Sequence, residues 1–175
     1  MNQTSTSGVQ RFLTLILGET GVFGISIHAV REILDYTDIT RLPRMPDHMR
    51  GVGDVRGQAV PVLDLGLKLG FGPVNQTLNT RIVIVEQPAP DGGVRLVGAL
   101  TEAVKEVLEL DAQTIAPPPA MGADAERACI QGIARHNGRF IMLLDTARVF
   151  SDEDLTGLAG LTQQAAAQGT AHNAA

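Results

Sequence analysis

The 175-residue sequence is poor in cysteine, in aromatic side chains and in basic charge. Its single cysteine, Cys129, allows no disulfide within the chain, so a hydrophobic core must hold the fold together. With no tryptophan, one tyrosine and 3% aromatic residues, that core has to consist of valine, isoleucine and leucine, and β-branched residues suit pleated strands. The 14 basic and 19 acidic residues are scattered and give a net charge of −5, which argues against nucleic acid as a partner.

Long hydrophobic runs are missing as well. No apolar stretch approaches the ~20 residues that a membrane-spanning helix needs, and residues 1–11 lack the basic region and apolar segment of a secretory signal. We therefore expect a cytoplasmic protein that does not insert into a membrane. At 44% hydrophobic residues, the chain can bury a sizeable core as one domain or as two small fused ones.

Short apolar segments separated by turn-forming residues run through most of the sequence. Gly18 and Gly21 flank a turn between residues 12–17 and 22–27, and Asn137-Gly138 is the strongest two-residue hairpin signal in the chain. Further strands are expected from Ile39 and at residues 81–86, 94–100, 106–110, 129–135 and 139–144. About ten short strands at this spacing favour an all-β barrel or sandwich.

Short helices are expected between some of these strands, at residues 28–34, 64–69, 145–150 and 152–161. In the first of them, Val30, Ile33 and Leu34 fall at helical spacing. Asp64 and Asp145 each follow an apolar strand, at the position of a helix N-cap. Residues 117–122 form a proline-rich, extended loop. We expect residues 1–10 to be flexible and residues 153–175 to form a C-terminal helix and a mobile tail.

The segment MRGVGDVRGQAVPVLDL, at residues 49–65, predicts a β-hairpin with its turn at Gly57 and Gln58. Arg56 then projects beside the turn, where a guanidinium can make several hydrogen bonds to a partner. The alternative is a salt bridge within the chain, to Asp54 or to Glu32. The glycines at 51, 53 and 57 either permit close approach of another backbone or serve ordinary turn geometry.

The sequence lacks the residue patterns that are typical of catalytic and cofactor-binding sites. The glycines of residues 51–57 lack the spacing of a phosphate-binding loop, and no G-x-S-x-G motif occurs. Cys129 lies in an apolar run and is interpreted as a buried small hydrophobe. The four histidines have no metal-ligand spacing, and we interpret Asp64 and Asp145 as helix caps instead of a catalytic carboxylate pair. We therefore expect no enzymatic activity, no metal and no cofactor.

The order of several motifs resembles the CheW family, the coupling proteins of bacterial chemotaxis arrays. These motifs are FLTLILG, GISIHAVREIL, ITRLPRMP, MRGVGDVRGQAVPVLDL, RIVIVE, VGALTEAVKEVLEL, IAPPP and IQGIARHNGRFIMLLDTARVF. The resemblance implies an all-β fold with short helices, in which residues 11–152 form two interleaved, five-stranded SH3-like barrels. It also implies a non-enzymatic adaptor that joins the regulatory domain of a CheA-type histidine kinase to the cytoplasmic hairpin tip of a chemoreceptor, in membrane-associated receptor arrays.

By position, the resemblance implies two groups of partner-binding residues. Arg56 and Gly57 match the family's Arg-Gly pair, whose usual context, Asn-Leu-Arg-Gly, is here Asp54-Val55-Arg56-Gly57. Asp54 therefore lacks the amide of the family's asparagine and could pair with a cation. The positions that match the receptor groove or the interface between the subdomains are Val30, Glu32, Ile82, Val83, Gly98 and Gly132.

A second hypothesis comes from a different class of protein. In a small-molecule-binding regulatory barrel, Arg56 would hold an anionic ligand between the two barrels. Such a site requires basic residues that converge on Arg56, and the nearby candidates are Arg41, Arg44 and Arg50.

Overall fold

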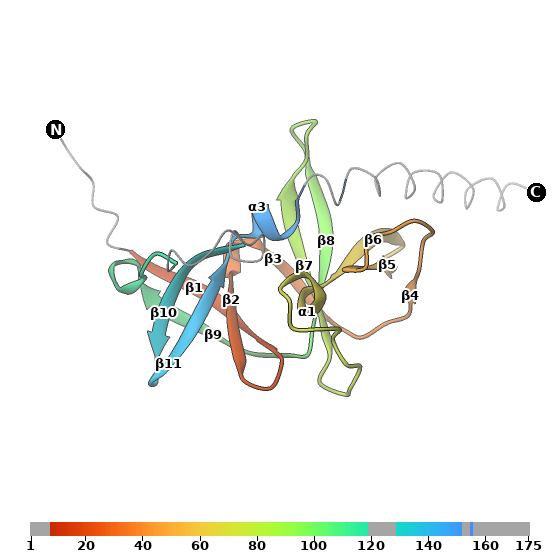
Figure 1. Cartoon of the computed structure of the whole chain (residues 1–175). Helices are drawn as coiled ribbons and strands as arrows, with labels where there is room; N and C mark the ends of the chain where they lie inside the picture. The colour runs from red at the N-terminus through yellow and green to blue at the C-terminus, as the bar shows by residue number, and fades with distance from the viewer. Residues whose placement is uncertain (1–7, 119–128, 152–154, 156–175) are drawn as a thin grey trace, which may run out of the picture.

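The computed structural model describes residues 8–118, 129–151 and 155, and within them the chain forms two β-sheets. The first sheet has five strands in the order β10-β11-β2-β1-β9, and the second has six in the order β3-β7-β8-β6-β5-β4 (Figure 1). The strands are β1 (Val9–Leu17), β2 (Gly21–Ser26), β3 (Val30–Asp35), β4 (Ile39–Thr40), β5 (Met49–Val55), β6 (Gln58–Asp64), β7 (Arg81–Pro88), β8 (Val94–Thr101), β9 (Ala103–Asp111), β10 (Ile130–His136) and β11 (Arg139–Leu144). The helices are η1 (Ile27–Ala29), α1 (Leu65–Lys68), η2 (Ala112–Thr114) and α3 (Thr146–Val149).

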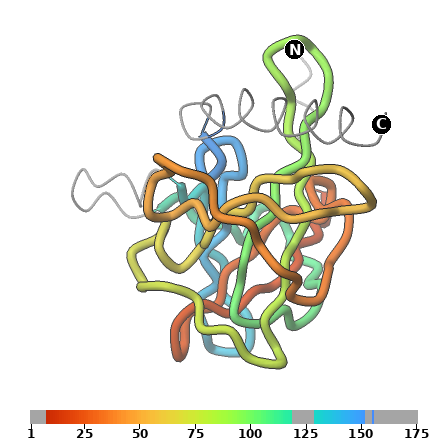
Figure 2. The backbone as a smooth tube through the Cα atoms, turned by 90° about the vertical axis from the view of Figure 1, so that its right-hand side faces the viewer, coloured from red at the N-terminus to blue at the C-terminus, as the bar shows by residue number. Residues whose placement is uncertain are grey.

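The two sheets correspond to the two SH3-like subdomains that the motif order implied. The second sheet is continuous in sequence, from β3 to β8, whereas the first combines β1 and β2 with β9, β10 and β11. The second sheet has six strands and not five, because the two residues Ile39 and Thr40 pair with β5. Both views show the β7–β8 hairpin projecting beyond the sheets (Figures 1 and 2).

The core extends through both sheets, because strand β7 is buried on both of its faces. Ile82 and Ile84 lie on one face and Val83 and Val85 on the other, and all four are at most 1% exposed. They belong to one hydrophobic cluster with first-sheet residues such as Leu15. This double burial explains the unbroken apolar run of β7, which a sheet with one solvated face would interrupt with polar residues.

Two buried polar side chains connect the second sheet to the first sheet and to helix α3. The Thr101 hydroxyl, on β8, donates to the backbone carbonyl of Ile16 on β1 at 3.0 Å. The Gln87 amide, on β7, donates to the carbonyl of Thr146 at the start of α3. Both side chains are at most 4% exposed, so these bonds satisfy groups that would otherwise be buried without a partner.

The predicted helix at residues 28–34 is wrong. A single 3₁₀ turn, η1, ends at Ala29, and Val30–Asp35 form strand β3, which pairs with β7 from Val30↔Val85 to Asp35↔Arg81. Burial along β3 alternates with period two, since Val30, Glu32 and Leu34 are the half-buried members. Val30 and Leu34 fit both periods while Ile33 fits only the helical one, and pairing with the available edge of β7 decides the outcome.

Both predicted helix caps are confirmed. Asp64 precedes α1 and accepts a hydrogen bond from the backbone N–H of Leu67 at 3.0 Å. Asp145 precedes α3 and accepts from the N–H of Ala147 at 3.0 Å. Cys129 is buried at 3% exposure, as its apolar surroundings predicted.

The ends of the domain differ in part from the predicted boundaries. Strand β1 begins at Val9, which pairs with Asp111, so Val9 and Gln10 are strand residues and not part of a flexible N-terminus. Of the predicted C-terminal helix and tail, only Leu155 is described, in helical conformation and 3% exposed in the core. Residues 1–7, 119–128, 152–154 and 156–175, with most of the predicted proline-rich loop and the tail, lie outside the described residues.

Candidate partner-binding surface

The turn of the β5–β6 hairpin consists of Arg56 and Gly57, one residue earlier than predicted. Val55 pairs with Gln58, and the two residues between them have φ angles of 53° and 80°. Two successive residues in the left-handed region form the type I′ turn that matches the twist of a hairpin. Arg56 therefore occupies the tip of the hairpin itself, in a backbone conformation that residues other than glycine, asparagine and aspartate seldom adopt.

Asp54 stabilises this turn. Its Oδ1 accepts a hydrogen bond from the N–H of Gly57, three residues on, at 2.8 Å, a contact that needs an oxygen acceptor and not a negative charge. The asparagine that is usual in the family offers the same acceptor. The replacement at position 54 therefore preserves the geometry of the tip.

We expect Asp54→Asn to leave the free energy of unfolding within about 0.5 kcal/mol of the original, because the acceptor is retained. Asp54→Ala removes the acceptor and should cost about 1 kcal/mol. Urea denaturation of the two variants checks this, and equal losses for both would show that the carboxylate charge, and not the turn contact, is what matters.

Arg56 forms an ion pair with Glu32, one of the two alternatives that the sequence left open. Its Nη2 donates to Glu32 Oε2 at 2.9 Å and its Nε to Oε1 at 3.3 Å. This hydrogen bond lowers the pKa of Glu32 below its ordinary value and raises that of Arg56. The Arg56 side chain is nevertheless 81% exposed, against 20% for Glu32, so the guanidinium is held in one orientation while most of its surface faces solvent.

The ion pair joins parts of the second sheet that are not neighbours in the strand order. Glu32 lies on β3 at one edge of the sheet, and Arg56 lies at the tip of the hairpin formed by β5 and β6. Strands β7 and β8 separate them in that order. The sheet must therefore curl for the two side chains to meet, and the contact fixes the hairpin tip against the β3 edge.

The other residues predicted for partner binding divide by exposure. Val55, Ile82 and Val83 are 5%, 1% and 0% exposed and belong to the core, and Val30 is half-buried against it. This burial does not fit a surface groove for either Ile82 or Val83, since Ile82 packs inside the second sheet beside Gly98 and Val83 lies on the opposite face of β7. The predicted residues with solvent-facing atoms at the hairpin are thus Asp54, Arg56 and Gly57.

Gly98 and Gly132, two of the glycines predicted for partner binding, serve packing. A Cβ at Gly98 would lie 3.0 Å from Ile82 Cγ2 and 3.2 Å from Val62 Cγ2, inside the second sheet. Gly132 lies in the first sheet, where a Cβ would lie 2.7 Å from Ile115 Cγ2. Gly132 is therefore on a different sheet from Arg56, and the structure does not bring the two together.

Gly51 is required for a close approach of backbones. Its φ is 142°, and a Cβ would lie 2.1 Å from the carbonyl oxygen of Thr40 on β4. Gly57, in contrast, serves the turn and has open space around it. The predicted close approach of a backbone is thus confirmed at Gly51, and the predicted turn geometry is confirmed at Gly57.

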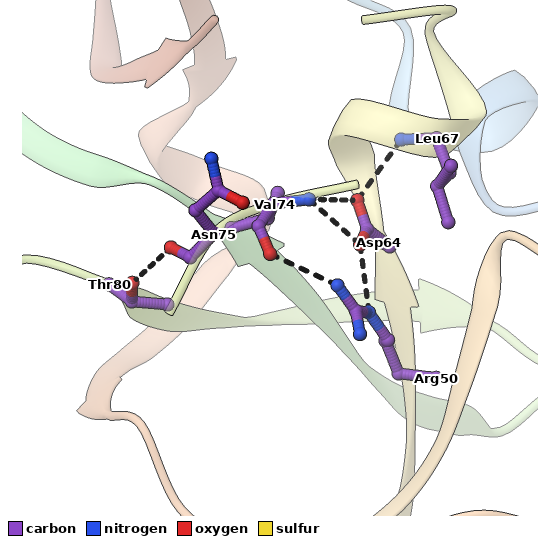
Figure 3. Close-up of polar contacts among 6 residues, drawn as sticks. All are labelled: Arg50, Asp64, Leu67, Val74, Asn75 and Thr80. Carbon is purple, nitrogen blue, oxygen red and sulfur yellow. Dashed lines mark hydrogen bonds and ion pairs between the residues drawn. The ribbon is translucent and has the colours of Figure 1, made fainter. Parts of the chain in front are cut away.

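A buried polar network at the other end of β5 was not foreseen. The Asp64 carboxylate, 0% exposed, accepts hydrogen bonds from Arg50 Nε at 2.8 Å and from the N–H groups of Leu67 and Val74 (Figure 3). Arg50 Nη2 also donates to the Val74 carbonyl at 3.0 Å, and the Thr80 hydroxyl donates to the carbonyl of Asn75. The network attaches the segment after α1 to strand β6.

This network removes the basis for an anion site at Arg56. Arg50 is engaged with Asp64, and Arg41 and Arg44 lie in the loop before β5, whereas Arg56 follows its last residue. A seven-residue strand is about 23 Å long. The basic residues that the small-molecule hypothesis required therefore do not converge.

The described residues contain neither a candidate metal site nor a membrane-spanning helix. In that part of the chain, no three His, Cys, Asp or Glu side chains lie together as a metal site would require. Its helices are also too short and too polar to cross a bilayer.

Comparisons with known proteins agree with this arrangement. The sequence profile of the CheW-like domain matches residues 11–154. The chain is 32% identical over 146 residues to "Chemotaxis protein CheW" of Klebsiella aerogenes, covering 83% of this chain and 84% of that protein. It is 30% identical over 149 residues to the Rhizobium meliloti protein of the same name, covering 85% and 92%.

A solved structure is similar as well. The crystal structure of the scaffolding protein TtCheW from Thermoanaerobacter tengcongensis superposes with a TM-score of 0.73 at 26% identity, covering 88% of this chain and 96% of that one. Fold, motif order and sequence similarity extend over the same region. The chain therefore belongs to the CheW family of chemotaxis coupling adaptors.

Proposed function

We propose that this adaptor acts without catalysis, in the cytoplasm, by joining the regulatory domain of a CheA-type histidine kinase to the cytoplasmic hairpin tip of a chemoreceptor in a membrane-associated array. The hairpin tip carrying Arg56 is the centre of the proposed recognition surface. The observation that supports it is an arginine that is 81% exposed and yet oriented by Glu32 and by the type I′ turn.

Preorganisation is the physical reason for this choice. A free arginine loses side-chain entropy when it binds, at a cost of about 0.5–1.5 kcal/mol for an immobilised side chain. The bidentate contact to Glu32 and the turn contact of Asp54 remove part of that freedom beforehand. A helical receptor tip can then meet the rigid hairpin by helix-in-groove recognition, with weak individual contacts strengthened by the multivalency of an array.

The test is co-sedimentation with membranes that contain a chemoreceptor and a purified CheA-type kinase. Arg56→Ala should remain folded, because the side chain is exposed, and should weaken recruitment by about tenfold or more, as expected for an arginine hot spot. Glu32→Gln removes the charge that orients Arg56 and should weaken recruitment to a smaller extent.

Arg11→Ala is the matched control. Arg11 also makes an exposed ion pair, with Glu109 at 3.0 Å, but on the first sheet. Its loss should leave recruitment unchanged. If the original protein recruits neither kinase nor receptor, the proposed partners are wrong, and if Arg56→Ala binds as well as Arg11→Ala, the proposed surface is wrong.

A further inference from the structure

One end of the first sheet is open between β2 and β11. These strands pair in parallel at only two positions, Met142↔Phe23 and Leu143↔Gly24, although β2 starts at Gly21 and β11 at Arg139. Before the paired positions the strands separate, toward the β10–β11 turn and the β1–β2 turn (Figure 1). Val22 and Ile141 line the resulting opening.

A β-bulge forms the opposite side of this opening. Leu13 pairs with Val107 and Leu15 with Val104, so Lys105 and Glu106 both lie opposite the single residue Thr14. The buried Thr14 hydroxyl fixes the bulge, since it donates to the Glu106 carbonyl at 2.8 Å and accepts from the Glu106 N–H at 3.1 Å. A bulge redirects the side chains of its strand, and bulges are frequent beside binding sites.

Together these elements line an open pocket of about 300 Å³, the lower end of the range for small-molecule sites. Val22, Leu108 and Ile141 supply its apolar lining and belong to the core of the first sheet. The polar residues around it are Thr14, Lys105, Glu106, His136, Asn137 and Arg139. The pocket thus combines apolar side chains with polar groups from strands β1 and β9 and from the β10–β11 turn.

The cations of this pocket differ from six other cations of the described chain, which are paired with carboxylates. Arginines 11, 31, 50, 56, 81 and 148 each have a carboxylate within 4.0 Å. Among the residues that the structure describes, none forms a hydrogen bond or an ion pair with the side chain of Lys105 or Arg139. The pocket contains one carboxylate, that of Glu106, beside these two cations. The charge of the pocket therefore favours the binding of an anion.

We propose that this pocket binds a small organic anion, a carboxylate attached to a compact apolar group. The carboxylate lies between Lys105 and Arg139, whose donors have no partner within the described chain, and the apolar group covers Val22, Leu108 and Ile141. The pocket is built from the first sheet alone. It is therefore separate from the Arg56 hairpin, which belongs to the second sheet.

The test is an NMR titration of the full chain with benzoate as the probe, observed at the methyl groups of Val22, Leu108 and Ile141. We expect saturable shifts confined to the pocket, with a dissociation constant on the order of 1 mM or below, as for other ligands of this size. Benzyl alcohol has the ring without the charge, and inorganic phosphate has charge without the ring. Each should bind at least about tenfold more weakly than benzoate.

The variant Lys105→Gln/Arg139→Gln should weaken benzoate binding by about tenfold or more. Arg41→Gln/Arg44→Gln, which removes two exposed arginines from the second sheet's β4–β5 loop, is the matched control and should leave binding unchanged. The proposal fails if benzoate gives no saturable shifts at tens of millimolar, if the shifts lie elsewhere, if the two variants behave alike, or if benzyl alcohol binds equally well.

Discussion

Val83→Glu is expected to leave the chain largely unfolded at 25 °C. Val83 is 0% exposed and lies on the same face of β7 as Gln87, whose amide donates to Thr146 at the start of α3, directly after β11. The substitution forfeits about 1.5–3 kcal/mol of apolar burial and adds several kcal/mol for an unpaired buried charge. Since a domain is stable by about 5–15 kcal/mol, this loss removes most or all of its stability, and circular dichroism with thermal denaturation measures it.

Ile33→Glu is the matched control for this prediction. Ile33 lies directly opposite Val83 across the β3–β7 pair but is 42% exposed, because β3 is an edge strand. We expect it to change the free energy of unfolding by less than about 1 kcal/mol. A folded Val83→Glu variant would mean that the two sheets do not pack on each other at β7. For the same reason, a charge at Val83 is unsuitable for probing partner binding.

Asp64→Ala is expected to destabilise the domain by about 3 kcal/mol or more, which corresponds to a decrease in Tm of about 6–12 °C. The Asp64 carboxylate is fully buried and accepts bonds from Arg50, Leu67 and Val74. Its removal leaves the guanidinium of Arg50 and two backbone N–H groups without their acceptor. Differential scanning calorimetry of the purified variant gives the change.

Asp145→Ala provides the comparison, because Asp145 occupies the equivalent cap before α3. Its Oδ1 accepts one backbone hydrogen bond, from Ala147, and Oδ2 lies 3.7 Å from Arg148 Nε. Loss of this half-exposed cap should cost about 1 kcal/mol. Equal losses at the two aspartates would show that capping alone accounts for Asp64 and that the network around Val74 adds nothing.

Local chemistry in the sequence was sufficient for several elements of the fold. Asn137 and Gly138, with φ angles of 50° and 74°, form the predicted two-residue hairpin turn, and both aspartate caps form as expected. In each case residues adjacent in the sequence determine the local backbone geometry, and no contact with a distant part of the chain changes it. The family resemblance added what local patterns could not supply, the division into two barrels.

Long-range packing decided the features that the sequence could not predict. The spacing of the apolar residues at 28–34 is compatible with a helix, but pairing with β7 makes most of the segment a strand. Arg56 could pair with Asp54 or with Glu32, and the curl of the second sheet brings it into contact with Glu32. Val83 looks like one residue of an ordinary strand, and its burial follows from the packing of a second sheet on β7. The pocket at Lys105 and Arg139 likewise depends on a bulge and on two strands that separate.

The chain order of the two sheets has a consequence for folding during synthesis. Strands β3 to β8 follow one another without interruption, so the second sheet can assemble as soon as its last strand leaves the ribosome. The hairpin of β1 and β2 is made first but must wait for β9, since Val9 pairs with Asp111, and for β11 after that. Such distant pairings form slowly, and a lone two-stranded hairpin is marginally stable in water. The apolar face of β1 and β2 is therefore open to aggregation in the nascent chain until β9 and β11 have been made.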